Sequence, residues 1–301
     1  MSNHKLVSQA SKVVRRGQLW VGQFRCMASP CEILIECERK SQARELIVLA
    51  QQEADRIEQK FSRYLDDNIV HQINEGGDCI AVDEETARLL DFAQHCYSLS
   101  EGWFDITSGI LRRAWNFNQR GRIPKQHEID QLLPHIGWEK VIWENPNLTV
   151  PKGMEIDFGG IGKEYAVDSV LTLLTRQTGK SFLVNFGGDC HASGPLGDGS
   201  PWMTGIENPH RPGDASAVIR LKKGALATSG DVFKFIEHAG KRYGHILNPK
   251  TGWPNTNSPL SVTVAAATCT EAGILSTLSM LQGKDAEQFL DRQDIKYWCY
   301  R

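Results

Sequence analysis

The sequence lacks the cysteine spacing that would indicate a zinc site or a disulfide framework. Its eight cysteines include no CxxC pair, and none of them stands at the spacing of metal ligands. They lie at positions 26, 31, 37, 79, 96, 190, 269 and 299. Scattered single thiols of this kind are typical of proteins from reducing compartments, so we expect free cysteines in a cytoplasmic protein.

Long apolar runs and an excess of positive charge are also missing. No run of about 18 apolar residues is present, which argues against a membrane-spanning helix. The basic residues Lys12, Arg15 and Arg16 are not followed by an apolar stretch, so we expect no secretory signal. The formal net charge of −2 and the lack of a basic, aromatic-rich face argue against nucleic-acid binding.

The composition that remains is that of an ordinary globular protein, with 301 residues of which 41% are apolar and 23% charged. Ser41 can cap a helix with apolar periodicity, a second helix is expected over about residues 84–99, and residues 181–186 have the apolar character of a buried strand. A helix that follows residue 162 is expected to end at Gly179, and a hairpin is expected around Asn145-Pro146-Asn147. Helices and strands do not alternate regularly, which predicts an α+β fold with a curved, mostly antiparallel sheet and packed helices. No linker interrupts the chain, so we expect a polar N-terminal tail over residues 1–18 and one domain over residues 19–301.

One glycine-rich turn stands out near the middle of the chain. A strand end at Ile156 and Asp157 runs into the glycines at 159, 160 and 162, and a helix is expected from Lys163. Glycines there let the backbone approach a ligand, and the free N–H groups of a helix start favour an anion such as phosphate. The alternative is a strand-turn-helix corner that needs glycine only for packing. The turn is neither a P-loop nor a dinucleotide fingerprint.

Two other stretches contain candidate site residues. Trp103, Phe104 and Asp105 follow a helix stop and could form a wall for a flat ring, or a core aromatic pair. His245 lies in a turn-rich loop, where it is either a surface residue or a base. A free imidazole titrates at roughly pH 6.5, so it can accept a proton at cellular pH.

Taken together, six motifs resemble those of the ApbE family, the FAD:protein FMN transferases, from Met27 to about Gly283. They are Phe61-Ser-Arg-Tyr64 with Ile73-Asn74, Gly102-Trp-Phe-Asp105-Ile-Thr-Ser-Gly109, the stretch from Ile156 to Asp168, Val184-Asn-Phe-Gly-Gly-Asp189, Thr228-Ser-Gly-Asp231 and His245-Ile-Leu-Asn-Pro-Lys-Thr-Gly252. The resemblance implies a single T-fold-like domain. It also implies a Mg²⁺-dependent enzyme that splits FAD, attaches FMN through a phosphoester to a Ser or Thr of a target protein, and releases AMP.

The resemblance also assigns expected roles to individual residues. His245 would be the catalytic base that takes the proton from the acceptor hydroxyl. The expected FAD contacts are Met27, Tyr64, Trp103, Phe104, Asp105, Asp157, Lys163 and Leu247. The expected metal ligands are the Gly160 carbonyl, Thr277 and, as a neutral oxygen, Ser276.

Two positions depart from the family pattern. The usual metal-binding Asp, four residues before Thr277, is Gly273, and the Asp that normally follows the histidine loop is Asn248. Gly273 in place of Asp removes a charged ligand, because residues 273 and 277 lie on the same face of a helix. We therefore expect weak Mg²⁺ binding that depends on the FAD phosphates, and a stronger site in Gly273→Asp if the side chain has room.

Three functions remain open from the sequence. The first is a transferase whose acceptor protein contains Asp-x-x-Ser/Thr-Gly-Ala-Ser/Thr. The others are an FAD-binding protein without transfer activity and an FAD pyrophosphatase that yields FMN and AMP. The chain itself comes close to the acceptor pattern at Asp105-Ile-Thr-Ser-Gly109 but continues with Ile-Leu, so we do not expect it to modify itself.

Overall fold

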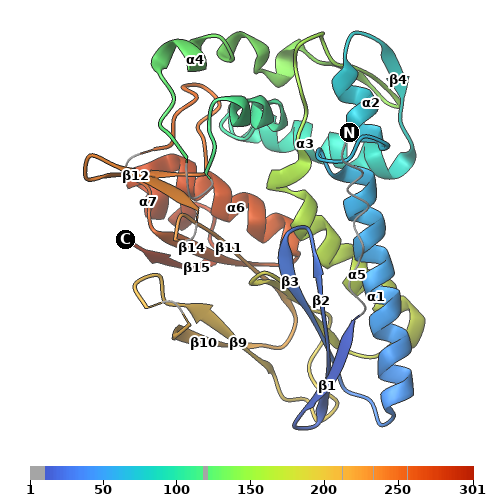
Figure 1. The fold of residues 1–301 in the computed structure, drawn as a ribbon. Helices are drawn as coiled ribbons and strands as arrows, with labels where there is room; N and C mark the ends of the chain where they lie inside the picture. The colour runs from blue at the N-terminus through green and yellow to red at the C-terminus, as the bar shows by residue number, and fades with distance from the viewer. Residues whose placement is uncertain (1–10, 118–120, 212, 233, 256) are drawn as a thin grey trace.

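A large antiparallel sheet forms the centre of the molecule (Figure 1). The computed structural model describes residues 11–117, 121–211, 213–232, 234–255 and 257–301. The strands of the sheet, in spatial order, are β1 (Lys12–Arg16), β2 (Leu19–Cys26), β3 (Ser29–Ile35), β7 (Phe182–Phe186), β8 (Asp189–Ala192), β11 (Gly224–Gly230), β14 (Ser261–Ala266) and β15 (Lys296–Tyr300). Every neighbouring pair is antiparallel, and the spatial order of the strands is also their order in the chain. The predicted α+β class with a mostly antiparallel sheet is confirmed.

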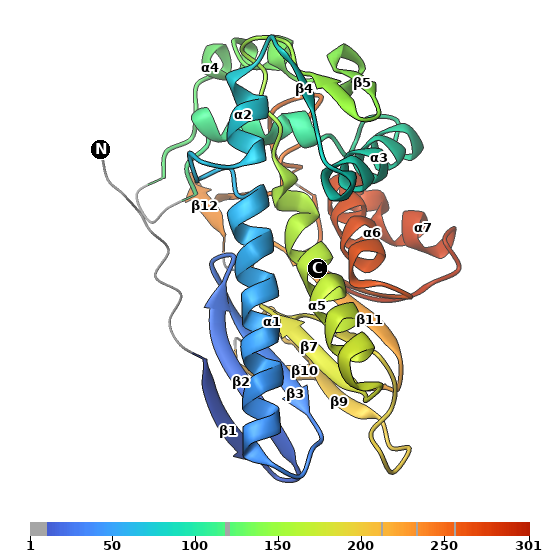
Figure 2. The same ribbon diagram turned by 90° about the vertical axis from the view of Figure 1, so that its right-hand side faces the viewer.

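Three long helices cover one face of this sheet: α1 (Lys40–Phe61), α5 (Gly162–Thr178) and α6 (Cys269–Gln282) (Figure 2). On α1 the buried residues Leu46, Ala50, Ala54 and Ile57 repeat every three or four positions, which produces an apolar stripe. The stripe packs on the sheet and on α5. Another helix, α7 (Ala286–Asp291), packs beside α6.

The opposite face of the sheet packs against a hairpin of β9 (Trp202–Glu207) and β10 (Ala215–Leu221). Side chains alternate between the two faces along β7: Phe182 and Val184 belong to the core under the helices, whereas Leu183 packs with Trp202 on the hairpin side. The result is three layers, with the sheet in the middle.

A smaller group of elements caps one end of the three layers (Figures 1 and 2). It contains the helices α2 (Ile69–Glu75), α3 (Glu84–Leu99) and α4 (Gln126–Asp130), the 3₁₀ helices at Ile106–Arg113, Leu133–His135 and Trp138–Lys140, and the strands β4 (Cys79–Ala81), β5 (Ile142–Glu144) and β6 (Asn147–Thr149). A further hairpin, β12 (Phe235–His238) with β13 (Lys241–Gly244), packs Ile236 and Tyr243 into an apolar cluster with Ile110 and Trp115. A 3₁₀ turn, Gly283–Asp285, joins α6 to α7.

The N-terminal tail is shorter than the sequence indicated. Residues 1–10 of the expected tail lie outside the described residues, but Lys12–Arg16 forms the edge strand β1 and pairs with β2. Gly17 turns the chain between the two strands with a φ of 62°. Val13 packs against the core, and this apolar contact explains why a polar segment joins the sheet. None of the helices in the described part of the chain is both long and apolar enough to cross a membrane.

Candidate active site

The glycine-rich turn joins a short 3₁₀ helix, Phe158–Gly160, to the start of α5. Asp157 caps this 3₁₀ helix, because its Oδ1 accepts a hydrogen bond from the Gly159 N–H at 2.8 Å. The Asp157 Oδ2 faces two arginines, 3.3 Å from Arg63 Nη1 and 3.7 Å from Arg112 Nε. Asp157 therefore fixes the turn and positions positive charge beside it.

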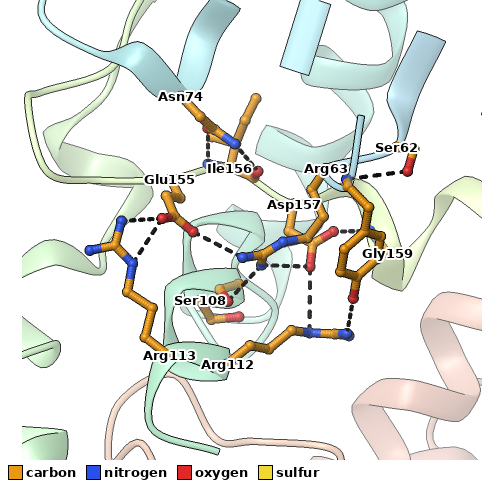
Figure 3. Close-up of polar contacts among 12 residues, drawn as sticks. Ser62, Arg63, Asn74, Ser108, Arg112, Arg113, Glu155, Ile156, Asp157 and Gly159 are labelled. Atoms are coloured by element: carbon orange, nitrogen blue, oxygen red, sulfur yellow. Dashed lines mark hydrogen bonds and ion pairs between the residues drawn. The ribbon is translucent and has the colours of Figure 1, made fainter. Parts of the chain in front are cut away.

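These contacts belong to a wider cluster of three arginines and two acids (Figure 3). Arg63 reaches both acids, since its Nη2 also lies 3.0 Å from Glu155 Oε2. Arg113 closes the cluster by pairing with Glu155. Arg63 is mostly buried, whereas the side chains of Arg112 and Arg113 are 49% and 57% exposed. The exposed guanidinium groups give this side of the turn the charge that a phosphate requires.

The expected aromatic wall is only partly exposed. Tyr64 is 72% exposed, and its hydroxyl accepts a hydrogen bond from Arg112 Nη1 at 2.8 Å. Trp103 is partly buried, with the Lys250 Nζ 5.3 Å from its ring centroid. Phe104 is buried and packs beneath Gly160. Tyr64 and Trp103 are thus the two members that a flat ring can reach.

Asp105 lies below this surface and is fully engaged within the protein. Its Oδ1 accepts hydrogen bonds from the Thr107 N–H and hydroxyl at 2.8 and 2.6 Å. Its Oδ2 accepts from the Trp138 N–H at 3.2 Å. Burial raises the pKa of Asp105, because the charged form loses hydration. The side chain of Asp105 therefore caps the helix Ile106–Arg113 and binds the backbone at Trp138.

Met27 and Leu247, also expected to contact FAD, lie in different parts of the fold. Met27 is partly buried in the turn between β2 and β3, where its φ of 50° is unusual for a side chain other than glycine. Leu247 packs in a separate apolar cluster with Trp115 and Trp253 and forms an isolated bridge with Pro254.

Lys163, in the first turn of α5, forms a buried ion pair with Asp189. Asp189 begins β8 and follows the turn formed by Gly187 and Gly188. Its Oδ1 accepts a hydrogen bond from the Thr228 N–H at 2.9 Å. Burial of Lys163 opposes its charge, but the Asp189 carboxylate outweighs burial and raises the pKa of Lys163. Lys163 is therefore held as a cation between α5 and the sheet.

Glu164 follows Lys163 and points to the same buried region. Its Oε2 is inaccessible to solvent and has no hydrogen-bond partner among the residues that the structure describes. Burial raises the pKa of Glu164 to about 8, and the nearby Asp189 carboxylate adds to the rise. Two acids thus share one buried region.

Three hydroxyl groups meet between β11 and α6. The Ser229 Oγ lies 2.9 Å from the Ser276 Oγ and 3.0 Å from the Thr277 Oγ1. Ser276 also donates to the Gly273 carbonyl at 2.9 Å. The two expected metal ligands on α6 therefore lie together, and α6 packs against the 3₁₀ helix that contains Gly160. Among the described residues this arrangement offers only oxygen donors, the type that Mg²⁺ prefers.

His245 follows β13 and is paired with Asp231, which follows β11. The Asp231 Oδ1 lies 3.3 Å from His245 Nδ1 and accepts a hydrogen bond from the His245 N–H at 3.2 Å. Gly244 makes this approach possible, because a Cβ there would lie 1.9 Å from Asp231 Oδ2. Nδ1 makes no hydrogen bond among the described residues, so Asp231 faces it through charge alone. A negative charge beside Nδ1 favours a proton there and leaves Nε2 as the nitrogen that can take one. The His245 side chain is 29% exposed.

Asn248, which stands where the family usually has an Asp, shapes the loop after His245. Its Oδ1 accepts a hydrogen bond from the Lys250 N–H at 2.9 Å, and its backbone bonds to Thr251, Gly252 and Trp253. This side chain is buried and closes a turn.

The structure brings together several residues to which the sequence assigned no role: Arg63, Glu164, Asp189, Ser229 and Asp231. All of them stand inside the motifs that indicated the resemblance, so the motifs were the available signal. Asp189 and Asp231 each follow a glycine within these motifs. For Glu164 the signal was weaker, since an acid in the first turn of a helix commonly serves the helix dipole alone.

A family model of the ApbE family matches residues 27–299. The chain is 30% identical over 239 residues to the FAD:protein FMN transferase of Haemophilus influenzae, covering 75% of this chain and 69% of that protein. It is 28% identical over 271 residues to the FAD:protein FMN transferase of Escherichia coli, covering 86% and 76% of the two chains.

Solved structures give the same result. The ApbE protein of Thermotoga maritima superimposes with a TM-score of 0.86 at 31% identity and covers 94% of both chains. The flavinyl transferase ApbE of Pseudomonas stutzeri superimposes with a TM-score of 0.82 at 25% identity, over 98% of this chain and 92% of that one. The overlap extends over nearly the whole fold.

Proposed function

The chain belongs to the ApbE family, and from this premise we propose that it transfers FMN from FAD to a serine or threonine of another protein and releases AMP. In this reaction the acceptor oxygen forms a bond to the FMN phosphorus. The bond from that phosphorus to the bridging oxygen of the diphosphate breaks, and AMP leaves with that oxygen. The acceptor is a protein segment of the type Asp-x-x-Ser/Thr-Gly-Ala-Ser/Thr.

The pairing of His245 with Asp231 is the observation that supports this function best. A hydroxyl is a poor nucleophile unless a base within hydrogen-bond reach takes its proton. Asp231 beside Nδ1 favours the tautomer in which Nε2 accepts that proton and stabilises the cation that forms. A partly exposed imidazole also leaves room for a segment of a second protein.

Other residues of the site would bind different parts of FAD. The exposed Tyr64 and the partly buried Trp103 offer aromatic surface for the rings, while Arg112 and Arg113 lie on the side of the turn suited to the diphosphate. Lys163, held as a cation by Asp189, adds positive charge at the start of α5. Asp157 fixes the turn beside the arginines, and Phe104 packs against Gly160. The expected FAD contacts of Met27, Asp105 and Leu247 stay predictions.

Mg²⁺ fits the oxygen-only donors between β11 and α6. The Gly160 carbonyl and the hydroxyls of Ser276 and Thr277 are the residues that would hold the ion. The buried, unpartnered Oε2 of Glu164 is an orphaned oxygen of the kind that a cation would satisfy. When bound, Mg²⁺ would offset the negative charge of the diphosphate.

The test compares wild type with His245→Asn, using FAD, Mg²⁺ and a peptide that contains Asp-x-x-Thr-Gly-Ala-Thr. We expect the variant to bind FAD as wild type does but to transfer FMN roughly 10²–10⁴-fold more slowly, the usual contribution of a positioned base. Transfer is read by flavin fluorescence of the peptide. His71→Asn, an exposed histidine on α2, is the control and keeps the wild-type rate. Equal transfer by wild type and His245→Asn would exclude His245 as the base.

A further inference from the structure

Gly273 on α6 and Glu164 on α5 occupy one shared space. A Cβ built on Gly273 would lie 2.6 Å from the Glu164 Cγ and 3.2 Å from its Cδ. The Glu164 side chain therefore crosses α6 at the position where a side chain of residue 273 would begin. Because α5 and α6 pack against each other, a side chain at position 273 would have to displace the Glu164 side chain.

The Glu164 carboxyl group ends in this space beside a second acid, Asp189. Its Oε2 is closed to solvent and lacks a hydrogen-bond donor among the described residues. The neighbouring cation, Lys163, is already paired with Asp189. A buried carboxyl oxygen that no hydrogen-bond donor satisfies is a position that a cation would stabilise.

The hydroxyl oxygens of Ser276 and Thr277 lie on the face of α6 that also contains Gly273. Residues 273, 276 and 277 are separated by three and four positions, so their side-chain directions coincide. Ser276 and Thr277 present their hydroxyls there, together with Ser229 from β11. The Glu164 side chain reaches this face at position 273, one helical turn of α6 before Ser276 and Thr277. Position 273 of α6 is itself a glycine and supplies no acid.

We propose that Glu164 supplies the carboxylate ligand of the divalent-cation site on α6, in place of a side chain at position 273. This inference rests on the proposed function, because the cation is the one that assists transfer from FAD. Glu164 and Gly273 then form a complementary pair, because the long acidic side chain on α5 fits only where α6 has no side chain. The condition set for Gly273→Asp, that its side chain has room, is not met while Glu164 keeps this position, so we expect the single substitution not to strengthen the site.

The experiment titrates Mn²⁺, a paramagnetic substitute for Mg²⁺, into the FAD-bound full-length protein and measures free Mn²⁺ by electron paramagnetic resonance. Glu164→Gln keeps the shape of the side chain and removes its charge, so we expect the Kd for Mn²⁺ to rise at least about 10-fold. Gly273→Asp alone is expected not to lower the Kd. The double variant Glu164→Gly with Gly273→Asp moves the acid back to α6 and is expected to bind within about 3-fold of wild type.

Glu271→Gln is the matched control, because Glu271 is an acid on the first turn of α6 whose carboxylate accepts from the Ala267 N–H at 3.3 Å. Its Kd should equal that of wild type. Unchanged Mn²⁺ binding in Glu164→Gln would overturn the proposal, and a loss confined to Glu271→Gln would assign the role to Glu271. Circular dichroism of each variant confirms folding.

The same samples separate this inference from the proposed function. If wild type binds Mn²⁺ through Glu164 but transfers no FMN to the peptide, the cation site stands and the transferase proposal fails. If wild type transfers FMN and Glu164→Gln binds Mn²⁺ normally, the transferase proposal stands and the assignment of Glu164 fails.

Discussion

At the scale of single residues, the contact between Asp231 and His245 leads to a kinetic prediction. Asp231→Asn keeps the size of the side chain but removes the charge beside Nδ1. A base that loses its orienting acid takes a proton less well, so we expect FMN transfer to slow roughly 10-fold to 10²-fold, with less effect than loss of the base itself. FAD affinity, measured by fluorescence titration, should not change.

Asp78→Asn, on an exposed turn, is the control for this prediction and keeps the wild-type rate. The pH profile distinguishes positioning from folding. A positioning role moves the pH dependence of the transfer rate, whereas a merely structural role lowers the rate equally at all pH values. A variant that transfers at the wild-type rate over the whole pH range would remove Asp231 from the mechanism.

Single residues of the site could be predicted from the sequence, but the contacts between them could not. The motifs indicated Asp157, Lys163 and His245, because acids and bases close to glycines stand out in a linear sequence, and Thr277 followed only from the resemblance. The roles of these residues and of the other candidates stay predictions. The relation between Glu164 and Gly273 could not be predicted, since it depends on how α5 packs on α6. From the sequence alone, Gly273 indicated only a lost acid.

At the scale of elements, the C-terminus of α5 allows a test of backbone conformation. Gly179 ends the helix in the left-handed region with a φ of 66°, and its N–H donates to the Thr175 carbonyl at 2.8 Å. A Cβ there would meet no atom within 4 Å, so the effect of Gly179→Ala comes from the backbone alone. We expect the free energy of unfolding to fall by about 1 kcal/mol.

Urea denaturation followed by circular dichroism measures this change. Gly162→Ala, at the other end of α5, is the control, because Gly162 does not have a positive φ and a Cβ there would make ordinary contact at 3.8 Å. This control should keep or slightly raise the stability. If the two variants lose stability equally, the left-handed cap is not the cause.

Element boundaries were predicted well where periodicity or glycine defined them. The helix ending at Gly179 and the hairpin around Asn145-Pro146-Asn147 match the expected positions. The start of α1 did not follow from the sequence: Ser41 looked like a cap, yet the helix begins at Lys40 without a side-chain cap. Edge strand β1 was missed because only its pairing with β2 distinguishes it from a polar tail.

At the scale of the whole molecule, Glu85 connects three helices. It lies on α3, pairs with Arg56 and Lys60 of α1, and accepts a hydrogen bond from the Tyr165 hydroxyl of α5 at 2.8 Å. The hydrogen bonds from Arg56, followed by those from Lys60 and Tyr165, lower the pKa of Glu85 to about 2. This acid should therefore make the stability of the assembled helices depend on pH.

The sign follows from the direction of the shift. A carboxyl group whose pKa is lower in the folded state stabilises the protein above its unfolded pKa of about 4.3, and this contribution is lost as the pH falls toward 2. We expect Glu85→Gln to be less stable than wild type at pH 7, and the difference to shrink as the pH falls from about 4. Urea midpoints across this pH range measure the effect.

The neighbouring residue supplies the matched control. Glu84 pairs only at the surface with Arg88, and its side chain is 89% exposed, so Glu84→Gln should change stability little at any pH. If the difference between wild type and Glu85→Gln stayed constant from pH 7 to pH 2, the pairs at Glu85 would not account for the acid sensitivity.

The strands of the large sheet lie in the same order in space as in the chain, and this order affects how the protein can fold while it is being synthesised. A nascent chain leaves the ribosome from its N-terminus, so β1, β2 and β3 are available first. Each later strand of the sheet then joins the one open edge beside its predecessor, and no strand has to be inserted between two that are already paired. The candidate site beside β11 is complete only when α6 has emerged, because Ser276 and Thr277 lie on that helix. The topology thus separates early growth of the sheet from late assembly of the site.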